Sequence, residues 1–236
     1  MAGANVATII YRFHLPAGVE EIVLRFDPDS FTLMVDAAAP VPDWAALEFC
    51  QCPHCPLSSA DTPVCPFARG LADFVERFAA FNSYDQAPIE IVTETRTVAA
   101  TKPLQIGMAS LVGLVGATSG CPHLAAFRPM ARFHLPFARD DETLYRVFTM
   151  YLLGRYLAEG ELPAGARALD GLIALHEAAT VVNRSMADRV RAAFRKDVVV
   201  NAVVILDMFA QAVPFAIEDG LAELRAMFGV EQAAAS

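Results

Sequence analysis

A change in residue pattern at Pro103 divides this sequence into two regions. Before it, short runs of β-branched and aromatic residues are separated by turn residues, and after it apolar residues recur at the spacing of long helices. Alternation with a period of two is typical of half-buried strands, and a period near 3.6 is typical of amphipathic helices. The sequence therefore predicts an α+β fold, with a β-rich region over residues 1–102 and a helical region over residues 103–236 that together form one compact unit.

The first region predicts an antiparallel sheet with one helix. Turn residues separate the runs that we expect to be strands, and apolar residues at helical spacing follow Cys65. The expected strands cover residues 6–13, 21–26, 31–35 and 89–98, and the expected helix ends near residue 82.

The second region predicts five helices, over residues 104–119, 140–159, 163–195, 201–217 and 221–228. The first of these carries no charged residue, and residues 198–217 carry only Asp207. Both segments also contain polar residues, and glycines interrupt the first, so we interpret them as buried helices and expect no membrane span. We expect Asp207 to face solvent or to pair with an arginine such as Arg184, and His176 and Asn183 to lie on a solvated helix surface.

Composition excludes several classes of protein. With 55% hydrophobic and 19% charged residues, the chain buries enough apolar surface to fold, so it is not disordered. A formal net charge of −9 argues against a nucleic-acid partner, because such binding begins with a basic surface. The first residues lack the pattern of a secretory signal, which indicates a cytoplasmic protein, and the predominance of Arg and Ala indicates a bacterial one.

Four of the five cysteines are followed directly by proline, namely Cys52, Cys55, Cys65 and Cys121. Thiols stay reduced in the cytoplasm, so such a group indicates metal ligands more than disulfides. Cys52 and Cys55 form a C-x₂-C pair, Cys65 follows, and Cys121 arrives from a distant part of the chain. We predict a structural Cys₄ zinc site that clamps the sheet region to the helical region.

Three alternatives to this site stay open. Cys50, His54 or His123 can replace one of the four ligands. The same thiolates suit a [4Fe-4S] or other iron–sulfur cluster, which would make the protein a redox enzyme, an electron carrier or a sensor. The cysteines can also be free core residues, because cysteine is often buried.

A second candidate site lies just after Cys121. Arg128, Arg132 and His134 fall within seven residues, and the two arginines are spaced i,i+4. On one helix face they would bind a carboxylate or phosphate. Salt bridges to the acidic first region, with a hydrogen-bonded core histidine, explain the same residues without a ligand.

The chain has no nucleotide-binding, serine-hydrolase, zinc-protease or kinase signature. The leading hypothesis is therefore a cytoplasmic metal-binding protein with a regulatory or ligand-binding role, and the iron–sulfur protein is its alternative. Whether it is an enzyme stays open. Its partner is expected to be a small molecule or a protein, including a second copy of the chain.

Overall fold

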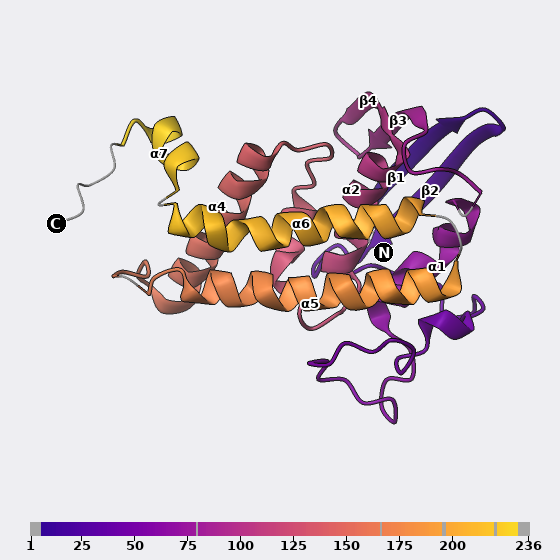
Figure 1. Ribbon diagram of the computed structural model, residues 1–236, viewed down its shortest axis with the longest axis horizontal. Coiled ribbons are helices and arrows are strands. Elements are labelled where there is room, and N and C mark those ends of the chain that lie inside the picture. The colour runs from indigo at the N-terminus through magenta and orange to yellow at the C-terminus, as the bar shows by residue number, and fades with distance from the viewer. Residues whose placement is uncertain (1–5, 79, 166, 195–196, 220, 231–236) are drawn as a thin grey trace, which may run out of the picture.

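A computed structural model describes residues 6–230, apart from residues 79, 166, 195–196 and 220. The described residues form a four-stranded antiparallel sheet, seven helices and two short 3₁₀ turns. The α+β class and the N-terminal antiparallel sheet are therefore confirmed. In Figure 1 the sheet lies at one end of the molecule, and the long helices α5 (Asp170–Ala193) and α6 (Val198–Glu218) run side by side along its length.

The sheet has the strand order β2-β1-β3-β4. Strand β1 (Ala7–Leu15) is central and pairs with β2 (Gly18–Phe26) on one side and with β3 (Gln86–Val92) on the other. Strand β4 (Thr97–Pro103) completes the sheet beside β3. Because strand side chains alternate between faces, Ile9, Tyr11 and Phe13 are all buried on the inner face of β1.

Two of the strand predictions are wrong. Residues 31–35 form a single bridge from Leu33 to Phe26, because the Asp27 carboxylate accepts hydrogen bonds from Ser30 and folds the chain into a turn there. Residues 89–98 belong to two strands, since a turn closed by a hydrogen bond between Thr93 N–H and the Arg96 carbonyl reverses the chain.

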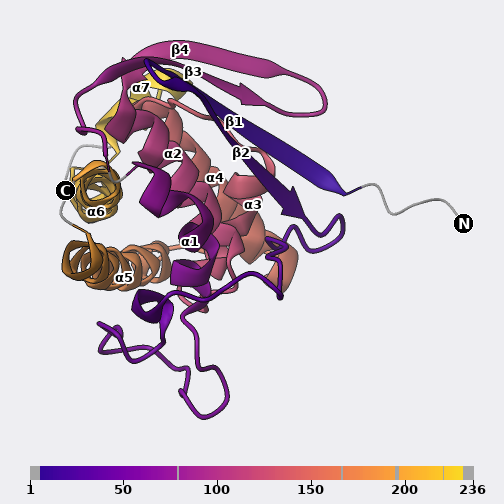
Figure 2. The same cartoon turned by 90° about the vertical axis from the view of Figure 1, so that its right-hand side faces the viewer.

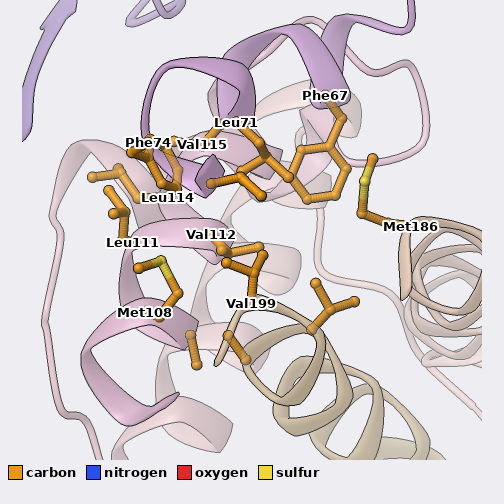
Figure 3. Close-up of a cluster of buried hydrophobic side chains, with 14 of the residues drawn as sticks. Phe67, Leu71, Phe74, Met108, Leu111, Val112, Leu114, Val115, Met186 and Val199 are labelled. Carbon is orange, nitrogen blue, oxygen red and sulfur yellow. The ribbon is translucent and has the colours of Figure 1, made fainter. Parts of the chain in front are cut away.

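Two helices cover the inner face of the sheet, as Figure 2 shows. Helix α1 (Pro66–Phe78) and helix α2 (Leu104–Thr118) each contribute side chains to the main core, and α2 also packs against α6. Figure 3 shows Val115 of α2 beside Leu71 and Phe74 of α1, and Val112 of α2 close to Val199 of α6. The prediction of a buried helix over residues 104–119 is confirmed, and the core draws residues from both regions of the sequence.

The remaining helices are α3 (Arg128–Arg132), α4 (Asp140–Glu159) and α7 (Ala222–Phe228). Helix α4 has the predicted bounds, whereas α5 begins at Asp170, not near Pro163. Asp207 on α6 accepts a hydrogen bond from Gln211 and lies 3.5 Å from Arg184 on α5, so the expected arginine partner is confirmed.

One described helix, α6, is long and apolar enough to cross a membrane by length and composition. Only 39% of its most apolar stretch is buried within the chain. Core helices of other proteins meet the same criterion, so this feature is weak evidence for a span.

Close packing between α2 and the sheet depends on Gly107. A Cβ atom added there would lie 2.5 Å from the Ile89 side chain and 2.9 Å from that of Phe13. We expect Gly107→Ala to lower the free energy of unfolding by about 1 to 3 kcal/mol through overpacking, measured by urea denaturation. Gly154→Ala on α4 is the control, because nothing lies within 4 Å of the added Cβ, and it should raise stability by up to about 1 kcal/mol. Equal effects of the two substitutions would contradict this account of the α2 contact.

Candidate functional site

The cysteine-rich loop joins β2 to α1 and lies beneath α5 in the view of Figure 1. Backbone hydrogen bonds close it, from Leu47 N–H to the Pro63 carbonyl at 2.8 Å and from Cys65 N–H to the Ala45 carbonyl at 2.8 Å. Within the loop, Cys55 N–H donates to the Cys52 carbonyl at 3.0 Å, so the C-x₂-C pair forms a tight turn. Both ends of the loop are therefore fixed, and the turn that carries two of the thiols is ordered.

The other two Cys-Pro pairs each begin a helical turn. The Cys65 carbonyl accepts the N–H of Arg69 at the start of α1, and the Cys121 carbonyl accepts the N–H groups of Leu124 and Ala125. Proline fits directly after such a residue because the first N–H of a helix has no partner within the helix. The first N–H groups of a helical turn are free of partners within the turn, and the backbone N–H groups of His123 and Leu124 favour the ionised form of Cys121.

All five cysteines line one small pocket, together with Ser185 and Arg189 of α5. Cys50 is exposed, whereas the four cysteines that precede proline are partly buried. The thiol of Cys52 is near enough to Cys55 and Cys65 for their charges to interact, and that of Cys121 interacts in the same way with Cys52 and Cys65. Nevertheless, no three His, Cys, Asp or Glu side chains of the described residues are arranged as a metal-ligand set.

Burial controls the ionisation of these thiols. It raises the pKa of Cys52, and that of Cys121 to about 11, and the neighbouring thiols add to both shifts. The Ser185 hydroxyl and the Arg189 cation act in the opposite direction on Cys52. As free side chains at neutral pH, Cys52 and Cys121 are therefore protonated, and a metal ion would have to displace their protons.

Two histidines, His54 and His123, connect the cysteine-rich loop to the segment after α2. The rings of His54 and His123 stack with centroids 3.8 Å apart and 5° between their planes. His123 donates its Nε2–H to the His54 carbonyl at 3.0 Å, and His54 donates its Nε2–H to the Ala178 carbonyl of α5 at 3.2 Å. The Nδ1 atom of His54 is buried without a hydrogen-bond partner among the described residues. Burial and the neighbouring His123 lower the pKa of His54, which favours its uncharged form at neutral pH.

The buried cation of this site is Arg189, whose side chain is 2% exposed. Its guanidinium donates to the carbonyls of Trp44 and Ala46 at 2.6 Å and of Leu47 at 3.1 Å, and it lies 5.8 Å from the Phe49 ring centroid. In the described part of the chain it has no carboxylate partner. A buried charge normally requires a counter-charge, and the Cys52 thiol, which interacts electrostatically with Arg189, is a group in the same pocket that can become anionic.

The three residues of the predicted anion site contact different neighbours. Arg132 donates to the Pro28 carbonyl at 3.1 Å and lies over the Phe31 ring, whereas His134 Nε2 lies 2.5 Å from the Tyr11 hydroxyl. Arg128 Nε is buried without a partner among the described residues. The two arginines do share helix α3, as their spacing indicates. Binding of an anion by these residues stays a prediction.

Residues 9–229 match the sequence profile of a family described as Domain of unknown function (DUF6901). The chain belongs to this family. No curated protein and no solved structure matches it. The match includes the four Cys-Pro pairs and, among the described residues, all the helices and all of the sheet except the first two residues of β1, so the DUF6901 domain includes the whole candidate site.

Two polar residues of this DUF6901 chain correct a prediction made from its sequence. His176 is 2% exposed and Asn183 is 5% exposed, so neither lies on a solvated helix surface. They are seven residues apart on α5, on the same stripe as the buried Ala179 and Met186. Sequence analysis also missed Arg189, which continues this stripe. The sequence does contain a signal for their burial, because all three polar residues share the helical spacing of the apolar stripe on α5.

His134 predicts a pH dependence of stability for this DUF6901 chain. Burial, with Arg146 and Arg96 nearby, lowers its pKa to about 3, from about 6.5 in an unfolded chain. Below pH 6.5 the unfolded state therefore takes up a proton that the folded state does not, and stability falls as pH decreases. We expect His134 to contribute a loss of up to about 1.4 kcal/mol per pH unit between pH 6 and pH 4 in urea denaturation.

His134→Gln should make this decline shallower by that amount. His54 and His176, whose pKa values burial also lowers, would preserve part of the decline. An identical pH slope in His134→Gln and the unsubstituted protein would show that His134 is not the group responsible.

Proposed function

We propose that this protein binds a zinc ion through Cys52, Cys55, Cys65 and Cys121, and that the ion has a structural role. The observation that carries the proposal is that these cysteines, from three separate parts of the chain, line one pocket beside a buried arginine that has no carboxylate partner in the described residues. Thiolate sulfur is a preferred ligand of zinc, and four thiolates suit its tetrahedral geometry.

Charge balance supports the proposal. Four thiolates and a divalent cation together carry two negative charges, which a neighbouring guanidinium would partly offset. Arg189 lies at this pocket and favours the ionised form of Cys52. The backbone N–H groups of His123 and Leu124 also favour the ionised form of Cys121, as N–H groups that face a thiolate do. A free-thiol core would leave this arginine without a counter-charge from the described residues.

The size of the pocket supports a structural role. Its cavity measures about 20 Å³, which is close to the space of a single water molecule. A catalytic zinc keeps an open coordination position for water and substrate, whereas a structural zinc is enclosed by four protein ligands. The proposed ion would join the loop before α1, the segment after α2 and, through Arg189 and the His54 hydrogen bond, helix α5.

Formation of the site requires the thiols to approach one another more closely than they do among the described residues. Zinc–sulfur bonds of about 2.3 Å bring tetrahedral sulfurs to within about 4 Å of one another. Rotation about the Cα–Cβ bond is the movement that cysteine offers for this, because the turns that carry the thiols are fixed by the backbone hydrogen bonds described above.

Elemental analysis of protein purified under reducing conditions tests the proposal. We expect about one zinc per chain in the unsubstituted protein and in Cys50→Ser, and loss of most of that zinc in Cys65→Ser. If the analysis instead finds iron with sulfide, and the protein is brown, the iron–sulfur alternative is correct and the zinc proposal is wrong. A chain that holds neither metal, and takes up no zinc when one equivalent is added, would refute metal binding.

A further inference from the structure

A second cavity lies among helices α2 to α6, apart from the cysteine pocket. Its volume is about 390 Å³, within the range of pockets that hold small organic molecules. Apolar side chains make up most of its wall, including Val112, Phe127, Val147 and Phe209. Asp140, at the start of α4, is the one exposed residue among the described residues that line the cavity, so it marks the rim.

His176 of α5 presents a hydrogen-bond acceptor to this cavity. Its Nδ1 lies 3.0 Å from the Leu172 carbonyl, which can only accept, so the ring proton is on Nδ1 and Nε2 carries a lone pair. Phe127 and Phe209, with centroids 5.2 Å and 6.5 Å from the imidazole, hold the ring in place. Within the described residues Nε2 has no hydrogen-bond partner, although the side chain is 2% exposed.

Asn183 lies two helical turns further along α5 and lines the same cavity. It is 5% exposed, and its side-chain amide makes no hydrogen bond to any other described residue. Neither the Asn183 amide nor His176 Nε2 is among the fully enclosed polar atoms that lack a partner, so both groups face the space of the cavity, where a ligand or an ordered water can reach them. Two such groups on one wall are therefore a sign of a built site and not of packing alone.

The charges around the cavity balance. Arg146 of α4 contributes one positive charge, and its guanidinium is engaged by the Met130 and Phe133 carbonyls at 2.6 Å and 3.0 Å. Asp140 contributes one negative charge at the rim, and Thr143 and Ser110 are neutral. Burial lowers the pKa of His134 and of His176, so both lining histidines are uncharged at neutral pH. An ionic ligand would therefore meet no net opposite charge.

We propose that this cavity binds an uncharged, largely apolar small molecule that carries a hydroxyl group. The hydroxyl donates to Nε2 of His176, the amide of Asn183 hydrogen-bonds a polar atom of the same molecule, and the apolar body fills the space between α2, α4 and α6. Phenols and comparable hydroxylated hydrocarbons have this chemistry. The site shares no cysteine with the proposed zinc centre, so each proposal can fail without the other.

Binding of 4-hydroxybiphenyl, measured by isothermal titration calorimetry at pH 7, tests the proposal. We expect one site per chain and an affinity about tenfold higher than that of biphenyl, since one hydrogen bond to a buried group contributes about 1 to 1.5 kcal/mol. Biphenyl-4-carboxylate should bind more weakly than 4-hydroxybiphenyl, because no net positive charge receives it. Absence of saturable binding, or equal affinity for the phenol and the hydrocarbon, would overturn the proposal.

His176→Phe keeps an aromatic ring in the wall and removes the acceptor. In this variant the two ligands, 4-hydroxybiphenyl and biphenyl, should bind with about equal affinity. Glu177→Gln, on the exposed neighbouring residue, should leave the ratio of the two affinities unchanged. Asn183→Leu provides a second test if His176→Phe does not fold, with an expected loss of phenol affinity of several-fold. A phenol preference that survives in both variants would place the hydroxyl elsewhere and contradict the assignment.

Discussion

Cys121→Ser should lower the midpoint of thermal unfolding by about 10 °C or more. The proposed zinc ion joins the segment after α2 to the loop before α1, and metal-binding free energy becomes folding free energy when the site exists only in the folded chain. A loss of about 3 to 5 kcal/mol in a domain of this size corresponds to a shift of this order. The measurement is a pair of melting curves, with and without a zinc chelator.

The effects of the chelator and of Cys121→Ser on the midpoint of unfolding should not be additive. Chelation should lower the midpoint of the unsubstituted protein nearly as far as the substitution does, and it should have little further effect on Cys121→Ser. Cys50→Ser is the matched control, because this cysteine is exposed and is not followed by proline, so its midpoint and its response to chelator should equal those of the unsubstituted protein. Midpoints that neither treatment moves would show that the cysteines do not form a metal clamp.

Arg189→Met should destabilise the protein by about 3 to 5 kcal/mol. The substitution keeps a long apolar side chain but leaves the buried carbonyls of Trp44, Ala46 and Leu47 without their donor. Each buried acceptor without a partner costs about 1 to 3 kcal/mol, and the loss also detaches the cysteine-rich loop from α5. Urea denaturation monitored by circular dichroism measures the effect.

Arg191→Met is the control for this prediction. Arg191 lies two residues further along α5, is exposed, and pairs with Asp188 on the surface at 2.9 Å. Exposed ion pairs contribute about 0 to 1 kcal/mol, so this variant should unfold at nearly the original urea concentration. If Arg189→Met were equally mild, the guanidinium would not be the group that holds the loop on α5.

Much of the fold could be predicted because local patterns decided it. The change near Pro103, the uncharged helix α2 and the acidic first turn that begins α4 are features of the chain itself, and the structure has them at the expected positions. The strand predictions failed where a polar turn interrupts an otherwise apolar run. The Asp27 carboxylate accepts a hydrogen bond from the N–H of Ser30, and the N–H of Thr93 donates to the Arg96 carbonyl. Each of these turn contacts outweighs the β propensity of the residues around it.

Fewer residues of the candidate site could be predicted from the sequence. The shared Cys-Pro context pointed to four residues that line one pocket, because each proline marks a local turn. Arg189 and His176 have no comparable motif, since their roles depend on which face of α5 meets the rest of the molecule. Only the tertiary arrangement shows that the guanidinium lies beneath the loop carbonyls and that the imidazole lies between Phe127 and Phe209.

X-ray absorption spectroscopy at the zinc edge tests the central claim most directly. The sample is the purified full chain with one equivalent of zinc, under reducing conditions. The account predicts a first shell of four sulfur atoms at about 2.3 Å, and a shell that loses one sulfur in Cys65→Ser. Three sulfurs and one nitrogen would mean that His54 or His123 replaces a cysteine. A first shell of oxygen and nitrogen atoms without sulfur would contradict the claim that these cysteines bind the metal.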